Sequence, residues 1–285
     1  MPQVDLRLHA RRKPQFVLPA GACDAHCHVF GPADRFPYAP GRRYTPDDAP
    51  KETLAALHDF LGVERVVIVQ ASCHATDNRA MLDAIAAAPD RVRGVAVADD
   101  DFSTRDFEIL HEGGVRGVRF NFVRHLGGAP DMNVFWRVLE RVQPLGWHVV
   151  LHMDAADIEA LTPTIRNLAM PFVIDHMGRV ESAKGVDQPA FRALLELARM
   201  DNCWVKVSGS ERISFPPYFA AVPFARALVE ASPDRTLWGT DFPHPNPTHD
   251  ADEADLVDLI PQFAPDPAGQ QKLLVGNPAR LYGFN

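Results

Sequence analysis

Residues 21–30 read Gly-Ala-Cys-Asp-Ala-His-Cys-His-Val-Phe, and this short run sets the pattern that the rest of the chain repeats. Seven further runs of strand length, rich in β-branched residues, follow it along the chain. They cover residues 65–71, 92–98, 115–122, 147–153, 171–177, 203–208 and 235–241. The sequence therefore predicts eight strands.

The segments between these runs carry apolar residues at helical spacing, as Leu54, Leu57 and Leu61 do. Helix start signals stand where they are needed, with Asp131 before one such segment and Pro189 at the beginning of another. Eight alternations of strand and helix predict an α/β fold, a single (β/α)8 TIM barrel. An open doubly wound sheet usually has fewer strands and a glycine fingerprint, and neither GxGxxG nor GxxxxGK[ST] occurs here.

One domain over residues 1–285 is the simplest organisation. We expect an N-terminal extension over residues 1–20 and a helical tail over 257–285 that packs on the outside of the barrel. Residues 31–50 are rich in Pro, Gly, Arg and Tyr and follow the first strand. This segment is predicted to be a long loop, and a candidate lid, over the carboxyl ends of the strands.

The composition is that of an ordinary soluble globular protein, with 46% hydrophobic and 23% charged residues. The chain has 37 acidic and 29 basic residues, which gives a formal charge of -8. This negative charge argues against a nucleic-acid partner. The apolar runs fall far short of the ~20 residues of a membrane helix, and no secretory signal is evident. We therefore expect no membrane contact and a cytoplasmic location, with the four cysteines as reduced thiols.

Ionisable residues gather at the carboxyl ends of the predicted strands, which meet at one mouth of a barrel. On the first strand, period-two alternation would put Asp24, His26 and His28 on one face, with Cys23 and Cys27 facing the helices. The later strands end in Arg119, Asn121, His152, Asp175, His176 and Asp241.

A single strand histidine is most often a hydrogen-bonded structural residue. Several ionisable groups at the same end of five strands are harder to explain in this way, because each would need its own buried partner. The set therefore indicates a functional site. His58 and His111 fall in helical patterns and are predicted to lie at the surface.

Three of these segments resemble the amidohydrolase superfamily: DAHCH at 24–28, DH at 175–176 and WGTDFPH at 238–244. The HxH element alone is weak evidence, but its order with the strand-six histidine and the strand-eight aspartate is specific. A closer likeness, to the 2-pyrone-4,6-dicarboxylate lactonase group, comes through GVRFNFV at 117–123 and GACDAHCHVFGP at 21–32. The likeness covers nearly the whole chain.

The resemblance implies an enzyme, a lactonase that hydrolyses a small acidic lactone in the breakdown of aromatic compounds. Such a reaction needs a base for water, groups that polarise a carbonyl and cations for the substrate's carboxylates. Asp241 is the predicted general base, and His26, His28 and His176 are predicted to polarise the carbonyl. The predicted substrate-binding residues are Tyr44, Arg119, Asn121, Arg124, His152, Arg179, Arg212, His244 and Asn246.

The chain departs from the lactonase group at two places. After the fourth strand the group has Lys-Arg where this chain has Arg124-His125, so the second carboxylate contact is expected to have moved. The group also has a tyrosine at the end of the fifth strand, where this chain has His152.

His152 opens the question of a metal. Mononuclear members of the superfamily hold one divalent ion with ligands that match His26, His28, His152 and Asp241, with His176 left to orient the water. A binuclear site would need a bridging residue on the fourth strand, which Arg119 and Asn121 cannot supply. The lactonase group itself works without metal, so the sequence leaves two alternatives, no cofactor or one divalent ion such as zinc.

Other functions also stay open. A sugar-lactone hydrolase or a lactone isomerase would hydrogen-bond hydroxyl groups in place of carboxylates, and a metal-dependent decarboxylase would use a similar set of residues. A non-enzymatic barrel is disfavoured because the strand-end set is complete. An oligomer is compatible with the sequence.

Overall fold

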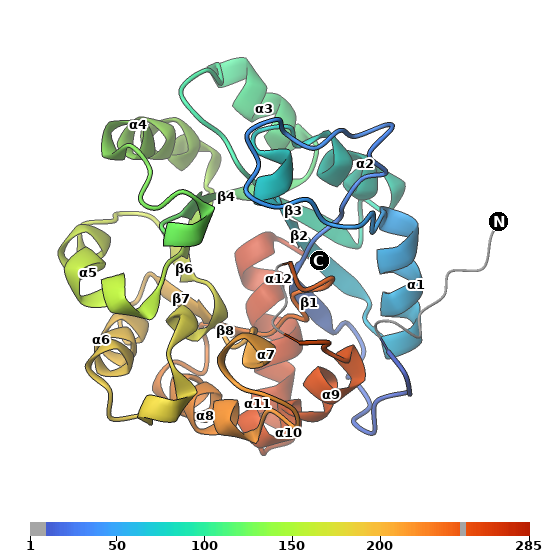
Figure 1. The fold of residues 1–285 in the computed structure, drawn as a ribbon, viewed down its shortest axis with the longest axis vertical. Helices are drawn as coiled ribbons and strands as arrows, with labels where there is room; N and C mark the ends of the chain where they lie inside the picture. The colour runs from blue at the N-terminus through green and yellow to red at the C-terminus, as the bar shows by residue number, and fades with distance from the viewer. Residues whose placement is uncertain (1–9, 246–248) are drawn as a thin grey trace.

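The structure, a computed structural model, describes residues 10–245 and 249–285. Eight parallel strands form one sheet in sequence order and curl into a nearly closed barrel (Figure 1). The predicted (β/α)8 fold and its eight strands are confirmed. The strands are β1 (Cys23–Cys27), β2 (Arg65–Val69), β3 (Val92–Ala96), β4 (Val115–Asn121), β5 (His148–His152), β6 (Phe172–Ile174), β7 (Cys203–Lys206) and β8 (Thr236–Leu237).

The barrel closes where the segment that follows β8 meets β1. The backbone N–H of Ala25 donates to the carbonyl of Trp238 at 2.9 Å, and that of Asp241 donates to the carbonyl of His26 at 2.7 Å. Gly239 lies between these contacts, and a β-carbon there would lie 2.6 Å from the backbone nitrogen of His26. Only glycine permits so close an approach.

Helices form a ring around the barrel (Figure 1). α4 begins after Asp131, whose side chain accepts a hydrogen bond from the N–H of Asn133, and α6 begins with Pro189, as predicted. No helix in the described ranges is long and apolar enough to cross a membrane. The helices are α1 (Lys51–Leu61), α2 (Arg79–Ala87), α3 (Thr104–Glu112), α4 (Met132–Val142), α5 (Ile158–Arg166), α6 (Pro189–Ala198), α7 (Ser210–Ile213), α8 (Val222–Ala231), α9 (Glu253–Asp258), α10 (Ile260–Phe263), α11 (Pro267–Gln271) and α12 (Asn277–Tyr282).

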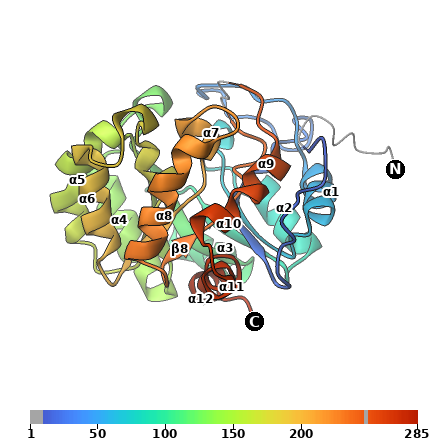
Figure 2. The ribbon, with the colours of Figure 1, turned by 90° about the horizontal axis from the view of Figure 1, so that it is seen from below.

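The C-terminal tail packs on the barrel at two places: α10 lies against the outer helix α8, and the end of the chain lies against the barrel interior. Tyr282 and Phe284 pack against the apolar layer that fills the barrel interior, which includes Val67, Val150 and Leu237. Figure 2 shows α12 at the end of the molecule opposite α7. The tail therefore closes the floor of the barrel, because the interior layer needs an apolar cover there.

Candidate active site

The first strand breaks the alternation that the sequence predicts. The register of β1 against β2 shifts between Asp24 and Cys27, as a β-bulge requires, and a bulge re-aims the side chains around it. Cys23 belongs to the interior layer, whereas Asp24 bonds a side chain of α1. The prediction that Asp24 shares the face of His26 and His28, with Cys23 facing the helices, is therefore wrong.

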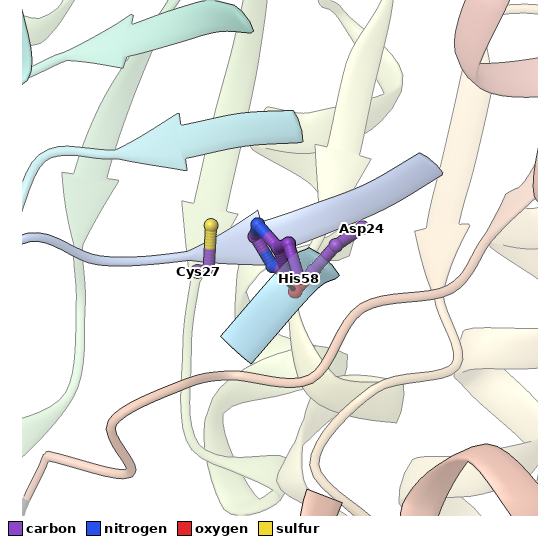
Figure 3. A group of neighbouring side chains, drawn as sticks. All are labelled: Asp24, Cys27 and His58. Atoms are coloured by element: carbon purple, nitrogen blue, oxygen red, sulfur yellow. Dashed lines mark hydrogen bonds and ion pairs between the residues drawn. The ribbon is translucent and has the colours of Figure 1, made fainter. Parts of the chain in front are cut away.

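The side chain of Asp24 links β1 to α1 and to the segment after β8 through hydrogen bonds. Its Oδ2 accepts hydrogen bonds from Thr240 Oγ1 at 2.5 Å and from His58 Nε2 at 3.0 Å, and its Oδ1 accepts the N–H groups of His26 and Thr240. His58, predicted at the surface, is only 1% exposed because it pairs with this carboxylate. Figure 3 shows Asp24 and His58 beside Cys27. These three side chains could ligate a metal ion, but the carboxylate of Asp24 already accepts four hydrogen bonds.

We expect Asp24→Ala to lower the free energy of unfolding by about 3 kcal/mol or more, because it leaves several buried donors without an acceptor. Urea denaturation measures this loss. The control is Asp157→Ala, which removes a partly exposed carboxylate paired with Arg124 and should cost less than about 1 kcal/mol. Equal losses in the two variants would contradict the structural role of Asp24.

Asp241 is the centre of the polar cluster at the mouth. It is fully buried and has a positive φ of 63°. Its Oδ2 accepts a hydrogen bond from Nε of Arg212, which α7 carries, and forms an ion pair with Nη2 of the same side chain. Its Oδ1 faces three imidazole Nε2 atoms, at 3.3 Å for His28, 3.6 Å for His26 and 3.9 Å for His176. The structure therefore brings the four predicted catalytic side chains together.

The charges in this cluster follow from burial and from Arg212. Burial opposes ionisation of Asp241, but the charge of Arg212 outweighs it and holds the pKa of the carboxyl well below its usual range. Burial lowers the pKa of His176 well below its ordinary value. Burial and Lys206 together lower the pKa of His26 to about 3. At neutral pH an aspartate therefore faces two uncharged imidazoles.

Beneath His26 lies a second polar layer, formed by Asp175, Arg119 and Lys206, of which the sequence did not predict Lys206. Asp175 is fully buried; its Oδ2 accepts a hydrogen bond from Arg119 Nε at 2.9 Å, and its Oδ1 lies 3.2 Å from Lys206 Nζ. Lys206 Nζ also lies 2.9 Å from His26 Nδ1. The sequence does hold a signal for this layer: a lysine stands inside the apolar run CWVKV at 203–207, and a buried charge needs a partner.

A small cavity opens at the mouth of the barrel. Its volume of about 20 Å³ holds about one water molecule. A ring-sized molecule does not fit in this volume. His125 lines the cavity but was not among the predicted site residues. The predicted site residues that line the cavity are His28, Tyr44, Arg119, His152, His176 and Arg212.

Two predicted arginines do not line the cavity. Arg124 has a side chain that is 76% exposed, and its Nη2 donates to Asp157 Oδ1 at 3.0 Å. Arg179 donates from Nε to Asp154 Oδ1 at 3.1 Å. The single-turn helix at Arg124–Leu126 presents His125 to the cavity in place of Arg124.

Asn121 and His244 contact neighbouring side chains and are not among the described residues that line the cavity. Asn121 Oδ1 accepts a hydrogen bond from His152 Nδ1 at 2.8 Å. His244 lies between Glu211 and Glu253, whose Oε1 atoms are 3.6 Å from its Nδ1 and 3.2 Å from its Nε2. Burial alone would lower the pKa of His244, but the two glutamates raise it to about 10. The predicted residue Asn246 lies outside the described residues.

The four predicted metal ligands do not assemble as a set. In the part of the chain that the structure describes, two groups of potential ligand atoms that include Asp241 lie within 4.8 Å of one another, and neither contains His28 or His152. One group is His26, His176 and Asp241, and the other is Glu211, Asp241 and His244. Arg212 occupies Oδ2 of Asp241 as well. The four-ligand set expected for a single divalent ion is therefore not assembled, although His26, His176 and Asp241 alone could ligate one.

Comparison with known proteins adds an independent line of observation. The amidohydrolase family model matches residues 23–284. A 2-pyrone-4,6-dicarboxylate hydrolase from Comamonas testosteroni is 49% identical over 282 residues, which cover 95% of this chain and 92% of that protein. A 4-sulfomuconolactone hydrolase from Rhizobium radiobacter is 43% identical, over 96% of this chain and 94% of that protein.

A solved structure is also similar. The crystal structure of a probable 2-pyrone-4,6-dicarboxylic acid hydrolase from Acinetobacter baumannii, with citric acid bound, superposes with a TM-score of 0.83. The two chains are 30% identical, and the match covers 93% of this chain and 100% of that one.

Proposed function

Because the chain belongs to the amidohydrolase family and is a lactone hydrolase, we propose that its substrate is a small lactone bearing carboxylates, of the kind represented by 2-pyrone-4,6-dicarboxylate. The observation that supports this proposal is the cation at the cavity wall. Arg119 is held through Nε, and no side chain in the described residues bonds its two terminal nitrogens. A guanidinium presented in this way suits a carboxylate.

The relatives agree with an acidic substrate. The names of two relatives refer to a dicarboxylate and to a sulfonated lactone, and the similar crystal structure holds citric acid, a tricarboxylic acid. Arg212 adds positive charge beside Arg119, although its guanidinium also bonds Asp241. Opening the cavity would let one carboxylate of the substrate reach Arg119.

We assign the role of general base to Asp241. A water molecule gives a proton to Asp241 as its oxygen attacks the lactone carbonyl carbon, and a tetrahedral oxyanion forms. When the oxyanion collapses, the bond from the carbonyl carbon to the ring oxygen breaks, and Asp241 returns the proton to that oxygen. The product is the ring-opened acid.

His28 helps to hold the water in this scheme. Its Nδ1 lies 2.7 Å from the carbonyl oxygen of Val69, which only accepts, so Nδ1 carries the hydrogen. In the neutral imidazole Nε2 is then an acceptor, 3.3 Å from Asp241 Oδ1. Two adjacent acceptors suit the two hydrogens of one water, so we place His28 with the water, whereas the sequence predicted a contact with the carbonyl.

A substrate panel tests the proposed function. The purified protein is assayed with 2-pyrone-4,6-dicarboxylate, its methyl ester and a neutral aldonolactone, with ring opening followed by absorbance or proton release. We expect kcat/KM to be highest for the dicarboxylate by at least about tenfold, as one charge-assisted contact supplies. Equal or faster turnover of the aldonolactone, or release of carbon dioxide, would overturn the proposal.

A further inference from the structure

Lys206 is a buried cation that the hydrolytic scheme above does not use. Its side chain has no exposure to solvent, and it ends β7 at the level of the first histidine of the HxH element. Its Nζ lies 3.2 Å from Asp175 Oδ1 and 2.9 Å from His26 Nδ1. Burying an ammonium is costly, so these two contacts decide what the lysine does.

The chemistry of these contacts fixes the hydrogen on His26. Burial lowers the pKa of Lys206, and the carboxylate of Asp175 opposes this effect by favouring the ammonium form. An ammonium has three donors and no acceptor. A ring nitrogen 2.9 Å from it must therefore accept. A neutral imidazole has one acceptor and one donor, so when Nδ1 of His26 accepts, its Nε2 carries the hydrogen.

We propose that Lys206 is a positioning residue that holds His26 as the Nε2–H tautomer. In this form the Nε2–H points into the site as a donor for the substrate's carbonyl oxygen, and His26 cannot ligate a metal ion. The catalytic part of the proposal rests on the proposed function, whereas the tautomer and the metal behaviour do not.

The surroundings of His26 Nε2 support this assignment. The atom is buried without a hydrogen-bond partner within the described residues, 3.6 Å from Asp241 Oδ1. A donor without a partner at this place is available to an oxyanion. His28 has the opposite tautomer, because its Nδ1 donates to the Val69 carbonyl. In the HxH element, Nε2 of His26 would thus donate a hydrogen bond, and Nε2 of His28 would accept one.

The same contact disfavours metal binding by His26. A histidine that binds a metal through Nε2 normally donates from Nδ1 to a carboxylate or carbonyl. Asp175 Oδ1 lies 3.2 Å from His26 Nδ1 and could accept in this way, but Lys206 Nζ stands closer to the same nitrogen. Removing the lysine's donor would free Nδ1 to donate to Asp175 and leave Nε2 with a lone pair.

The tautomer can be measured in the wild-type protein by ¹⁵N-detected histidine NMR at neutral pH. The His26 signals are assigned through their loss in His26→Asn. We expect a protonated Nε2 and an unprotonated Nδ1. A protonated Nδ1 would overturn the proposal, and this measurement needs neither substrate nor a Lys206 variant.

Metal binding and kinetics test the role of the lysine. Lys206→Met keeps the length of the side chain without a donor, and Lys206→Arg, the matched control, keeps a cationic donor. In titrations with Co²⁺ and Zn²⁺, we expect no stoichiometric binding at the mouth of the wild type or of Lys206→Arg, and affinity at least about tenfold higher in Lys206→Met. Stoichiometric metal on wild-type His26, or no gain in Lys206→Met, would overturn the proposal.

The kinetic readout separates positioning from structural support. In metal-free buffer, Lys206→Met should lower kcat by about 10²-fold, as loss of one aligned oxyanion donor does, with KM within about threefold. Lys206→Arg should recover a large part of kcat. An unchanged kcat in Lys206→Met would contradict the proposal. If no lactone is turned over, the proposed function fails, while the tautomer and the metal titrations still decide the role of Lys206.

Discussion

Asp241→Asn is expected to lower kcat for a dicarboxylate lactone by at least about 10²-fold, because removal of a general base commonly costs 10²- to 10⁴-fold. The amide keeps the shape of the side chain, and its oxygen can still accept a hydrogen bond from Arg212. It cannot take a proton from water. KM should change much less than kcat, since Asp241 contacts the water and not the carboxylates of the substrate.

Stability and an equivalent substitution elsewhere control this experiment. Circular dichroism and the thermal midpoint should show a folded variant, because Glu211 Oε1, 3.7 Å from Arg212 Nε, remains as a second carboxylate for the arginine. Asp157→Asn also removes a carboxylate paired with an arginine, but away from the cavity, and should leave kcat within about twofold. If Asp241→Asn kept about a third or more of the wild-type kcat, Asp241 would have no place in the mechanism.

The fold could be predicted from the sequence because its signals are local. The strands of a parallel barrel are covered on both faces, so each one reads as a continuous apolar run bounded by turn residues. β5 and β7 show this plainly: their described residues are all buried, and each ends in a polar side chain, His152 or Lys206. Because parallel strands end at one mouth, the alignment of polar ends followed from the topology alone.

The parts that could not be predicted depend on pairing between distant segments. The bulge in β1 reverses the inward and outward order around Asp24, which accepts a hydrogen bond from the segment after β8. His58 is separated from Asp24 by 34 residues, so nothing near it in the sequence marked it as buried. One-residue displacements of this kind lie below the resolution of a periodicity argument.

The arginines show the same limit at the site. A guanidinium near a strand end can face the cavity, a neighbouring aspartate or solvent, and the sequence does not distinguish these choices. Arg119 lines the cavity. Arg212 lines the cavity and also donates a hydrogen bond to Asp241, whereas Arg124 donates a hydrogen bond to Asp157. The choice depends on which carboxylates other elements bring close, which is a property of the assembled barrel.

Arg119→Met should raise KM for the dicarboxylate by about 10- to 100-fold, because a charge-assisted contact contributes about 1.5–3 kcal/mol and each 1.4 kcal/mol is tenfold. The fold should survive, since Asp175 keeps Lys206 as a partner at 3.2 Å. The effect should fall on KM and less on kcat, because Arg119 holds a part of the substrate that does not react.

The matched control for this change is Arg124→Met, the same substitution at a guanidinium that is exposed and paired with Asp157. Its KM should stay within about twofold of the wild type. A neutral aldonolactone should distinguish the two variants far less than the dicarboxylate does, because it has no anion to leave unpaired.

If Arg119→Met left KM for the dicarboxylate unchanged, a carboxylated substrate would be excluded at this position, even with Asp241 established as the base. If Arg124→Met raised KM instead, the second carboxylate contact would lie on the segment after β4, where the sequence placed it.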